Sequence, residues 1–358
     1  MASKPFPALT HLIIRISVEN EIASPIPDDF LGGSAPCLQI IHLDNVAFPA
    51  LQTLLLSASH LVELQLHLIR IDVDGNTVLP VAMAMCLAQL PRLKILVLQF
   101  SLRFPPSVPI LPSPVMVTRI LLPALTDFEF TGTSKYLEDF VAQIDCPQLD
   151  QIKISYQTGP TEFQVTQLIQ FFSRSISPFS LPFGHAKFCL DARSVVIDLY
   201  PPTNCTSLDS RHPATAIISC NPVVDTWYFS PMLDELLSVL LSTVVDLKFV
   251  ERSWINYSIG DEYNPDWLHF LCQPSALQAI YASPALAGKI GRAFKSVKGE
   301  VIAATLQSLD LICLEGQASY LEEFVAVRQV SGRPVTVAGT EAEFDQRLSE
   351  KLMMTDDQ

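Results

Sequence analysis

The residues whose types could support metal chemistry are spaced poorly for it. Residues 72–76, Asp-Val-Asp-Gly-Asn, have the acidic alternation of a calcium-binding loop, in which carboxylate oxygens ligate the ion. Their glycine comes two positions early, and Met83 stands where a bidentate glutamate is needed. A turn between repeats is the better interpretation. His60 and His67 are separated by a strand-like phrase, which makes them poor co-ligands.

The cysteines and the catalytic motifs give no stronger signal. Eight cysteines are scattered without a C-x-x-C pair, as expected of buried thiols in a reducing compartment. The chain lacks G-x-S-x-G, H-E-x-x-H and G-x-x-x-x-G-K-[ST], the motifs for acyl transfer, zinc proteolysis and phosphate binding. We therefore predict a protein that is not an enzyme, with no catalytic residues, metal site or cofactor. An enzyme whose site forms only in the fold is the least favoured alternative.

Charge indicates which partners to expect. The net charge of −14 disfavours nucleic acid and anionic membranes, both of which require neutralisation by lysine and arginine. One basic island stands out, with cations at every third position, which on a helix form a broad basic face. A solvated helix face is the simpler interpretation, and contact with an acidic partner is the functional one. The four residues are Lys289, Arg292, Lys295 and Lys298.

The chain shows no targeting or membrane segment. Mean hydropathy is +0.31, yet no run of about 18 uncharged apolar residues occurs. The first residues lack the apolar core of a signal peptide. The sequence therefore predicts an intracellular protein, cytoplasmic or nuclear.

One phrase, L-x-x-L-x-L, recurs along the 358 residues, usually just after a proline. Successive first leucines of its first six copies are 29, 23, 32, 32 and 24 residues apart, against about 20–29 for leucine-rich repeats. Three intervals fit and two need insertions. The six copies begin at Leu9, Leu38, Leu61, Leu93, Leu125 and Leu149, three later ones begin at Val244, Leu277 and Leu306, and a weaker one surrounds Ile197 and Leu199.

Helix-like segments separate the phrases. One of them, 134–144, begins with Ser134 as the predicted N-cap and has Glu138 and Asp139 in its first turns, where the helix dipole favours acids. Strand alternating with helix predicts parallel strands. The fold class is thus α/β: a leucine-rich-repeat solenoid with irregular repeats, a curved parallel sheet and helices on its convex side. The expected helices lie in 79–90, 134–144, 161–175, 230–242 and 264–274.

We expect one solenoid over residues 1–350, since no long polar linker interrupts it. The proline-rich middle, 157–232, fits worst and is interpreted as extended strands and loops. Residues 351–358 should form a frayed tail.

The side chain between the last two leucines of each phrase should point away from the core, because neighbouring side chains of a strand alternate between faces. These positions form a mixed polar row on the predicted concave face, which solenoids use for binding. A protein or peptide ligand fits the row better than a nucleic acid or a membrane. The row comprises Ile13, His42, Gln65, Val97, Glu129, Lys153, Asp198, Lys248, Tyr281 and Asp310.

Longer phrases resemble the leucine-rich region of fungal F-box-type proteins, across almost the whole chain. The resemblance implies a leucine-rich-repeat fold and a role in substrate recognition by a ubiquitin ligase. The phrases are PDDFLGG-x-AP-x-LQ (27–39), LLLSA-x-HLVEL-x-L (54–66), LLPALT-x-F (121–128), YLED-x-VA-x-IDCP-x-LD (136–150) and FVA-x-RQ-x-SGRPVTV (324–337).

Members of that family place an F-box ahead of the repeats. The segment Pro27-Asp28-Asp29-Phe30-Leu31 resembles the first residues of an F-box. Gly32 and Gly33 would break the required helix, so we expect this segment to be the loop entering a repeat. A ligase adaptor would then be a partner only if an F-box lay upstream of this chain. A free-standing leucine-rich-repeat inhibitor or scaffold with no ligase link is the alternative.

Overall fold

The chain divides into two compact units, residues 1–180 and 181–358, and each is described by itself. The prediction of one solenoid over residues 1–350 stays a prediction. The computed structural model describes residues 6–15, 24–25, 30–47, 54–70, 79–101, 119–156, 165–175, 183–190, 195–200, 216–220, 237–251, 279–282, 309–312 and 335–338.

The first unit is an α/β structure whose main sheet is entirely parallel, in the order β1-β3-β5-β6-β8-β10. Two short parallel pairs, β2 with β4 and β7 with β9, accompany it. The elements are β1 (His11–Arg15), β2 (Ser24–Pro25), a 3-10 helix η1 (Phe30–Gly33), β3 (Ile40–Asp44), β4 (Val46–Ala47), β5 (Glu63–Arg70), α2 (Pro80–Leu87), β6 (Ile95–Ser101), β7 (Ile120–Leu121), β8 (Asp127–Gly132), α3 (Ser134–Val141), β9 (Ile144–Asp145), β10 (Gln151–Tyr156) and α4 (Thr166–Ser175).

Each of the six repeated phrases in this unit forms one strand of the main sheet, in one register. The middle apolar residues are Cα partners from strand to strand, and all but the edge residue Leu12 are fully buried. The middle leucine of a phrase, expected to point into the core because the residue after it points outward, does so at Leu64 and Leu96. The aligned residues are Leu12, Ile41, Leu64, Leu96, Phe128 and Ile152.

A tight turn precedes every strand of the main sheet and explains the recurring proline. The backbone N–H of each phrase's first leucine donates to the carbonyl three residues earlier, at 3.0 to 3.4 Å. The proline occupies the second position of this turn, where its fixed φ is favourable and its missing N–H costs nothing. The prolines at that position are Pro7, Pro36, Pro91, Pro123 and Pro147.

One carbonyl per repeat then aligns the next strand. The oxygen of the residue before each strand accepts two successive N–H groups from the next repeat, at 2.8 to 3.1 Å. This shared acceptor fixes where the following strand begins relative to the previous one. The acceptors are Thr10, Gln39, Val62, Lys94 and Thr126.

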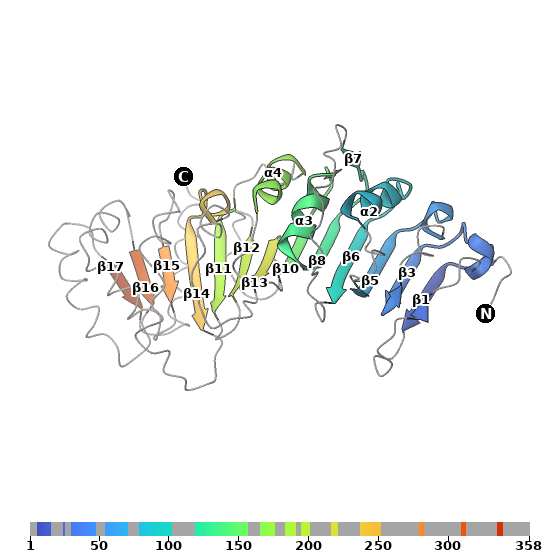
Figure 1. The fold of residues 1–358 in the computed structure, drawn as a ribbon. Coiled ribbons are helices and arrows are strands. Elements are labelled where there is room, and N and C mark those ends of the chain that lie inside the picture. The colour runs from blue at the N-terminus through green and yellow to red at the C-terminus, as the bar shows by residue number, and fades with distance from the viewer. Residues whose placement is uncertain are drawn as a thin grey trace, which may run out of the picture. The chain divides into compact units, whose positions relative to one another are not determined.

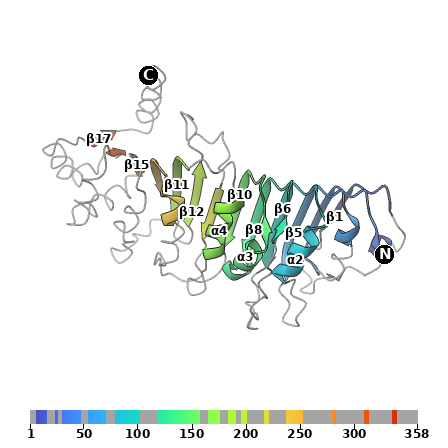
Figure 2. The ribbon, with the colours of Figure 1, turned by 90° about the horizontal axis from the view of Figure 1, so that it is seen from above.

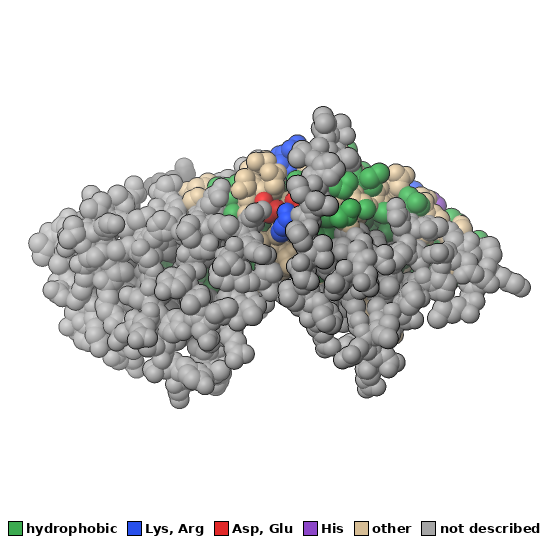
Figure 3. Space-filling model, in the orientation of Figure 1, with side chains coloured by type: hydrophobic (Ala, Val, Ile, Leu, Met, Phe, Trp, Pro, Cys, Tyr) green, Lys and Arg blue, Asp and Glu red, His purple; other side chains and the backbone are tan. Residues whose placement is uncertain are grey.

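The helices α2, α3 and α4 lie side by side over one face of this sheet (Figures 1 and 2). In Figure 3, seen from the helix side, hydrophobic side chains gather over α2 and charged ones near α3 and α4. The helix α2 has apolar residues on all sides, so that Met83 is buried while Met85 is 55% exposed. Helices predicted in 79–90, 134–144 and 161–175 are thus confirmed, with shorter bounds.

The helix α3 corrects two local predictions. Its N-cap is Thr133, not Ser134: the Thr133 hydroxyl accepts the N–H of Tyr136 at 3.4 Å. Both residue types are good caps, and the sequence could not separate adjacent candidates. Glu138 and Asp139 lie beyond the first turn.

Glu138 instead caps the next helix. Its carboxylate is 4% exposed and accepts the N–H groups of Gln167 and Leu168 at 2.6 and 2.9 Å, at the start of α4. Four N–H groups at a helix start lack partners within the helix, and the dipole there favours negative charge. At the C-terminal end of α4, Arg174 donates to Asp145 and to the carbonyl of Val141. Both ends of α4 are therefore bonded to α3 or to the residues that follow α3.

Aromatic rings fill the space between the sheet and α3. Phe100 and Tyr136 have centroids 4.4 Å apart, and Phe128 and Phe140 are 5.8 Å apart. Gly132 lies among these rings, where a Cβ would come within 2.9 Å of the Phe130 side chain. No larger residue fits at this position without moving the ring.

The second unit contains a mixed sheet in the order β13-β12-β11-β14-β15 and a parallel pair, β16 with β17. Predicted phrases account for β12, β14, β15 and β16. On the buried face of this sheet, Phe188 stacks on Phe249, with ring centroids 5.3 Å apart. The strands are β11 (His185–Leu190), β12 (Val195–Tyr200), β13 (Ala216–Cys220), β14 (Asp246–Glu251), β15 (Ala279–Ala282), β16 (Leu309–Ile312) and β17 (Val335–Ala338).

The prediction of parallel strands throughout is wrong here, because β12 runs antiparallel to both β11 and β13. Residues 191–194 link β11 to β12, and a parallel neighbour would need a crossover of about a dozen residues. Extended strands in the proline-rich middle are nevertheless confirmed by β11, β12 and β13. Of the helices expected later, residues 237–242 of 230–242 are described: 237–240 are helical, and 241–242 form a bend and a turn. The segment 264–274 lies outside the described residues.

Within the part of the chain that the structure describes, no helix has the length and apolarity that crossing a membrane requires.

The opposite faces of β6 generate a prediction about stability. Leu96→Ala should lower the free energy of unfolding by about 2–5 kcal/mol, because it leaves a cavity in a fully buried layer. Val97→Ala, the next residue but on the other face, should cost less than about 1 kcal/mol. Urea unfolding of both variants measures the difference, and equal losses would mean that the strand faces are assigned wrongly. Leu309, also predicted as core, has a side chain outside the described residues.

The cap on α4 generates a second prediction. Glu138→Gln should cost about 2 kcal/mol or more, since it removes the charge that two backbone N–H groups address in a buried site. Asp139→Asn is the matched control: its carboxylate meets Lys135 at 3.4 Å, is 26% exposed, and should cost less than about 0.5 kcal/mol. If urea unfolding gave the two variants the same stability, the cap would contribute nothing.

Candidate interaction surface

The face of the first unit's sheet away from α2, α3 and α4 is called the open face below. It carries the alternate residues of the six strands. All of them except the buried Thr131 are half-buried or exposed, while their neighbours within the strand are buried on β3, β5, β6, β8 and β10 and half-buried on the edge strand β1. The predicted outward orientation of the row is thus confirmed for this unit. Its residues are His11, Ile13, Arg15, Ile40, His42, Asp44, Glu63, Gln65, His67, Ile95, Val97, Gln99, Asp127, Glu129, Thr131, Gln151, Lys153 and Ser155.

The strands bring six of the row residues together as direct neighbours. Each is the Cα partner of the next, and stacked strands are about 4.8 Å apart. The sequence placed these six on one face, and the register now orders them. They are Ile13, His42, Gln65, Val97, Glu129 and Lys153.

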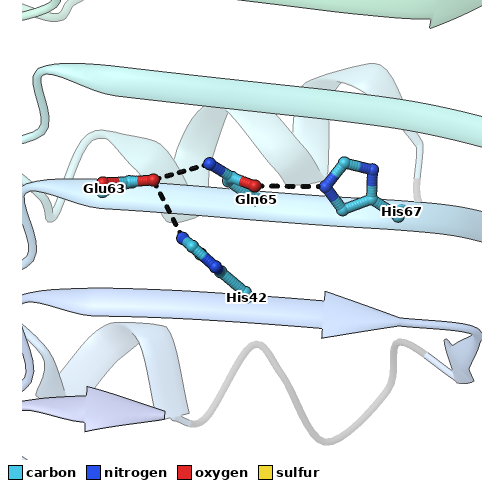
Figure 4. Close-up of polar contacts among 4 residues, drawn as sticks. All are labelled: His42, Glu63, Gln65 and His67. Carbon is cyan, nitrogen blue, oxygen red and sulfur yellow. Dashed lines mark hydrogen bonds and ion pairs between the residues drawn. The ribbon is translucent and has the colours of Figure 1, made fainter. Parts of the chain in front are cut away.

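A hydrogen-bonded network covers β3, β5 and β6 on this face. Glu63 Oε1 lies 2.8 Å from His42 Nε2 and accepts from Gln65 Nε2 at 2.6 Å (Figure 4). Gln65 Oε1 lies 3.2 Å from His67 Nε2, and His67 Nδ1 lies 2.7 Å from Gln99 Oε1. The network holds five polar side chains in defined positions, which reduces the conformational entropy that these side chains would lose when a partner binds.

Both ring nitrogens of His67 face amide oxygens in this arrangement. An imidazolium satisfies both contacts, because it donates at each nitrogen, whereas the neutral ring donates at only one. With a neutral ring, the Gln99 amide must turn so that its nitrogen donates to Nδ1. The proton on His67 and the orientation of Gln99 are therefore linked.

Further along the row, Lys153 Nζ donates to Glu129 Oε1 at 3.0 Å, and the two side chains are 53% and 38% exposed. Such exposed pairs contribute only about 0–1 kcal/mol to stability. This ion pair can therefore be replaced by ion pairs with charged groups of a partner at little cost in stability.

In the second unit, Asp198, Lys248 and Tyr281 also fall into one row, but Lys187 of β11 lies between the first two. We missed Lys187 because β11 carries no L-x-x-L-x-L phrase. The alternation of apolar residues in Ala186, Phe188 and Leu190 was the only signal for this strand. A cross-strand pair, His185 Nδ1 with Asp246 Oδ2 at 2.9 Å, flanks the row.

Several predicted residues cannot be placed with their side chains. The side chain of Tyr281 and that of Asp310, whose backbone pairs with Thr336, lie outside those described. The segments 71–78 and 283–300 are also outside the described residues, and with them the calcium-like loop and the basic set Lys289, Arg292, Lys295 and Lys298.

Two buried thiols, Cys86 and Cys146, and the phenol of Tyr200 are unsuited to acid–base or nucleophilic chemistry at neutral pH. Burial raises the pKa of the Cys86 thiol, and burial and then the Asp145 charge raise that of Cys146, so both remain protonated at neutral pH. Burial, with Asp198 and Cys189 adding to it, raises the pKa of Tyr200 to about 12. Among the described residues, no three histidines, cysteines or acids converge as a metal site would require.

Against models of known protein families and against functionally curated proteins, the chain gives no match. Its class is therefore defined by the structure alone: an α/β protein with a mostly parallel sheet and one polar, ordered sheet face.

The weakness of the exposed pair generates a prediction. Reversing both charges, Glu129→Lys with Lys153→Glu, should change the free energy of unfolding by less than about 1 kcal/mol, because both side chains are exposed. Urea unfolding and far-ultraviolet circular dichroism check the result. A loss as large as that of Leu96→Ala would mean that these charges contribute to the fold and are not available to a partner.

Proposed function

We propose that the chain is a leucine-rich-repeat solenoid that acts as a protein-interaction module, without enzymatic activity, and that its partner binds on the open face. Each repeat in the first unit comprises a tight turn, with proline in five of the six, and a strand whose apolar residues point inward. The helices α2, α3 and α4 lie between successive strands in sequence and on one face of the sheet. That arrangement supports the proposed leucine-rich-repeat solenoid, because a strand and a helix-side connection in each repeat are typical of that class. The observation that carries the proposal is the six-strand register, which presents polar side chains in order on one face.

The composition of the open face supports binding over catalysis. It has acids, bases, amides and aliphatic residues in alternation, and the five polar side chains of the network on β3, β5 and β6 bind one another. Non-obligate protein interfaces are about as polar as the rest of a protein surface, so a polar face with scattered aliphatic residues suits such an interface. A catalytic site would instead require titratable groups converging on one reacting atom.

The resemblance of the long phrases to F-box-type proteins supports a narrower proposal, that the partner is a protein presented to a ubiquitin ligase. Ligase adaptor binding is a separate property, because the F-box and not the repeats provides it in that family. A free-standing inhibitor or scaffold uses the same face without an adaptor. Co-purification of an adaptor subunit with the chain distinguishes these two roles.

A photo-crosslinking experiment tests the proposal. A photoreactive residue is placed at Val97 on the open face or, as the control, at Met85, which is 55% exposed on the helix side. In extracts of the source cells, we expect one defined protein to be crosslinked at position 97 and not at 85. Excess unlabelled chain should compete with it, whereas excess Gln65→Arg chain should not, because a long charged side chain would obstruct the face. Equal crosslinking at the two positions would contradict the proposal.

A further inference from the structure

The centre of the open face has two aliphatic residues on β6, flanked by Glu63 and Gln65 on β5 and by two carboxylates on β8. On β6, Ile95 and Val97 are half-buried, and their Cα partners are Glu63 and Gln65 on β5 on one side. On the other side they are Asp127 and Glu129 on β8, with Ile95 opposite Asp127 and Val97 opposite Glu129. Because adjacent strands are about 4.8 Å apart, the lines on β5 and β8 are separated by about 10 Å at the backbone. We call these six residues the central strip.

The central strip carries three carboxylates, which come from β5 and β8. Among the side chains that the structure describes, β5, β6 and β8 place no lysine or arginine on the open face, and the side chain of Arg70, at the end of β5, lies outside those described. The nearest cation on the face, Lys153 of β10, pairs with Glu129 alone. Among the described side chains, the remaining arginine of the face is Arg15, on the edge strand β1.

Each carboxylate of the strip uses one oxygen within the chain and leaves the other for a ligand. Glu63 accepts through Oε1, Asp127 through Oδ2 from the Thr126 hydroxyl, and Glu129 through Oε1. Among the described residues, none donates to the second oxygen of these three groups. An ionised carboxylate has about four acceptor positions, so each retains capacity for a guanidinium or ammonium donor.

On this charge complementarity, and resting on the function proposed above, we propose that the central strip binds a basic, extended segment of a partner protein. The aliphatic stem of an arginine or lysine packs on Ile95 and Val97, and its cationic head group reaches Glu63 or Asp127. Long basic side chains bury their methylene groups on apolar surface in this way while the charge stays near water. Arginine fits best, because its planar fork binds carboxylates through two parallel hydrogen bonds.

The same residues disfavour the other common ligands. Nucleic acid would bring phosphates against three carboxylates, and a basic surface is the first requirement for binding it. Among its described side chains, the open face also has no phenylalanine, tyrosine or tryptophan, the large rings on which a base or a sugar would stack most extensively. A basic protein segment is therefore the occupant that both the charge and the aliphatic pair fit.

The test uses the full chain and a labelled peptide in which arginine alternates with valine, with fluorescence anisotropy as the readout. We expect saturable binding that weakens as salt screens the charges. Asp127→Asn should weaken it about tenfold, or about 1.4 kcal/mol. Asp139→Asn, an equal charge change on the helix side, should change it less than about twofold. A peptide with glutamate in place of arginine should not bind.

The outcomes separate this inference from the proposed function. If crosslinking at Val97 identifies a partner but the arginine peptide does not bind, or binds Asp127→Asn and Asp139→Asn equally well, the basic ligand is wrong and the interaction module stands. Preferential binding of the glutamate peptide would also overturn the inference. If position 97 crosslinks no better than Met85, the proposed function fails and this inference fails with it. Circular dichroism of each variant confirms that the sheet is intact.

Discussion

The first unit depends on a carbonyl oxygen that accepts two N–H groups from the following repeat. Five copies of this contact fix the relative positions of all six strands of its main sheet, and Gly184 makes the same contact with Val245 and Asp246 in the second unit. A slip of one residue would move every leucine of a strand from the core to the solvent face. The shared acceptor and the proline turn before it prevent that slip, and the ordering of the polar groups on the open face follows from them.

The helix layer solves a different problem, which is the burial of helix ends. The N-terminus of α4 packs against α3 where little water can reach it, and Glu138 provides the acceptor that water would otherwise supply. The carboxylate is charged and buried, which is costly unless it is fully hydrogen-bonded. Two strong bonds from backbone donors and the favourable helix dipole offset that cost. The same carboxylate thus orients α4 with respect to α3.

The strands of the first unit could be predicted because their signal is local. The proline, the leucine spacing and the alternation of faces all lie within eight or nine residues of one another, so the row from Ile13 to Lys153 was readable directly. Contacts between distant residues were not readable. The pairing of Glu138 with α4 spans 29 and 30 residues, and that of His67 with Gln99 spans 32. In the second unit, β11 and β13 lack the leucine phrase and could not be predicted from it. The antiparallel direction of β12 follows from the short link between β11 and β12, which the repeat pattern does not indicate.

Because of the shared carbonyl, which aligns each strand with the strand before it, the length of the segment between two strands can change without changing the alignment of those strands. The long interval between β6 and β8 illustrates this, since Leu96 and Phe128 remain partners across it. The side chains of the open face, in turn, contribute little to the buried layer. New binding preferences can therefore arise by replacing single surface residues, strand by strand, on a scaffold that stays unchanged.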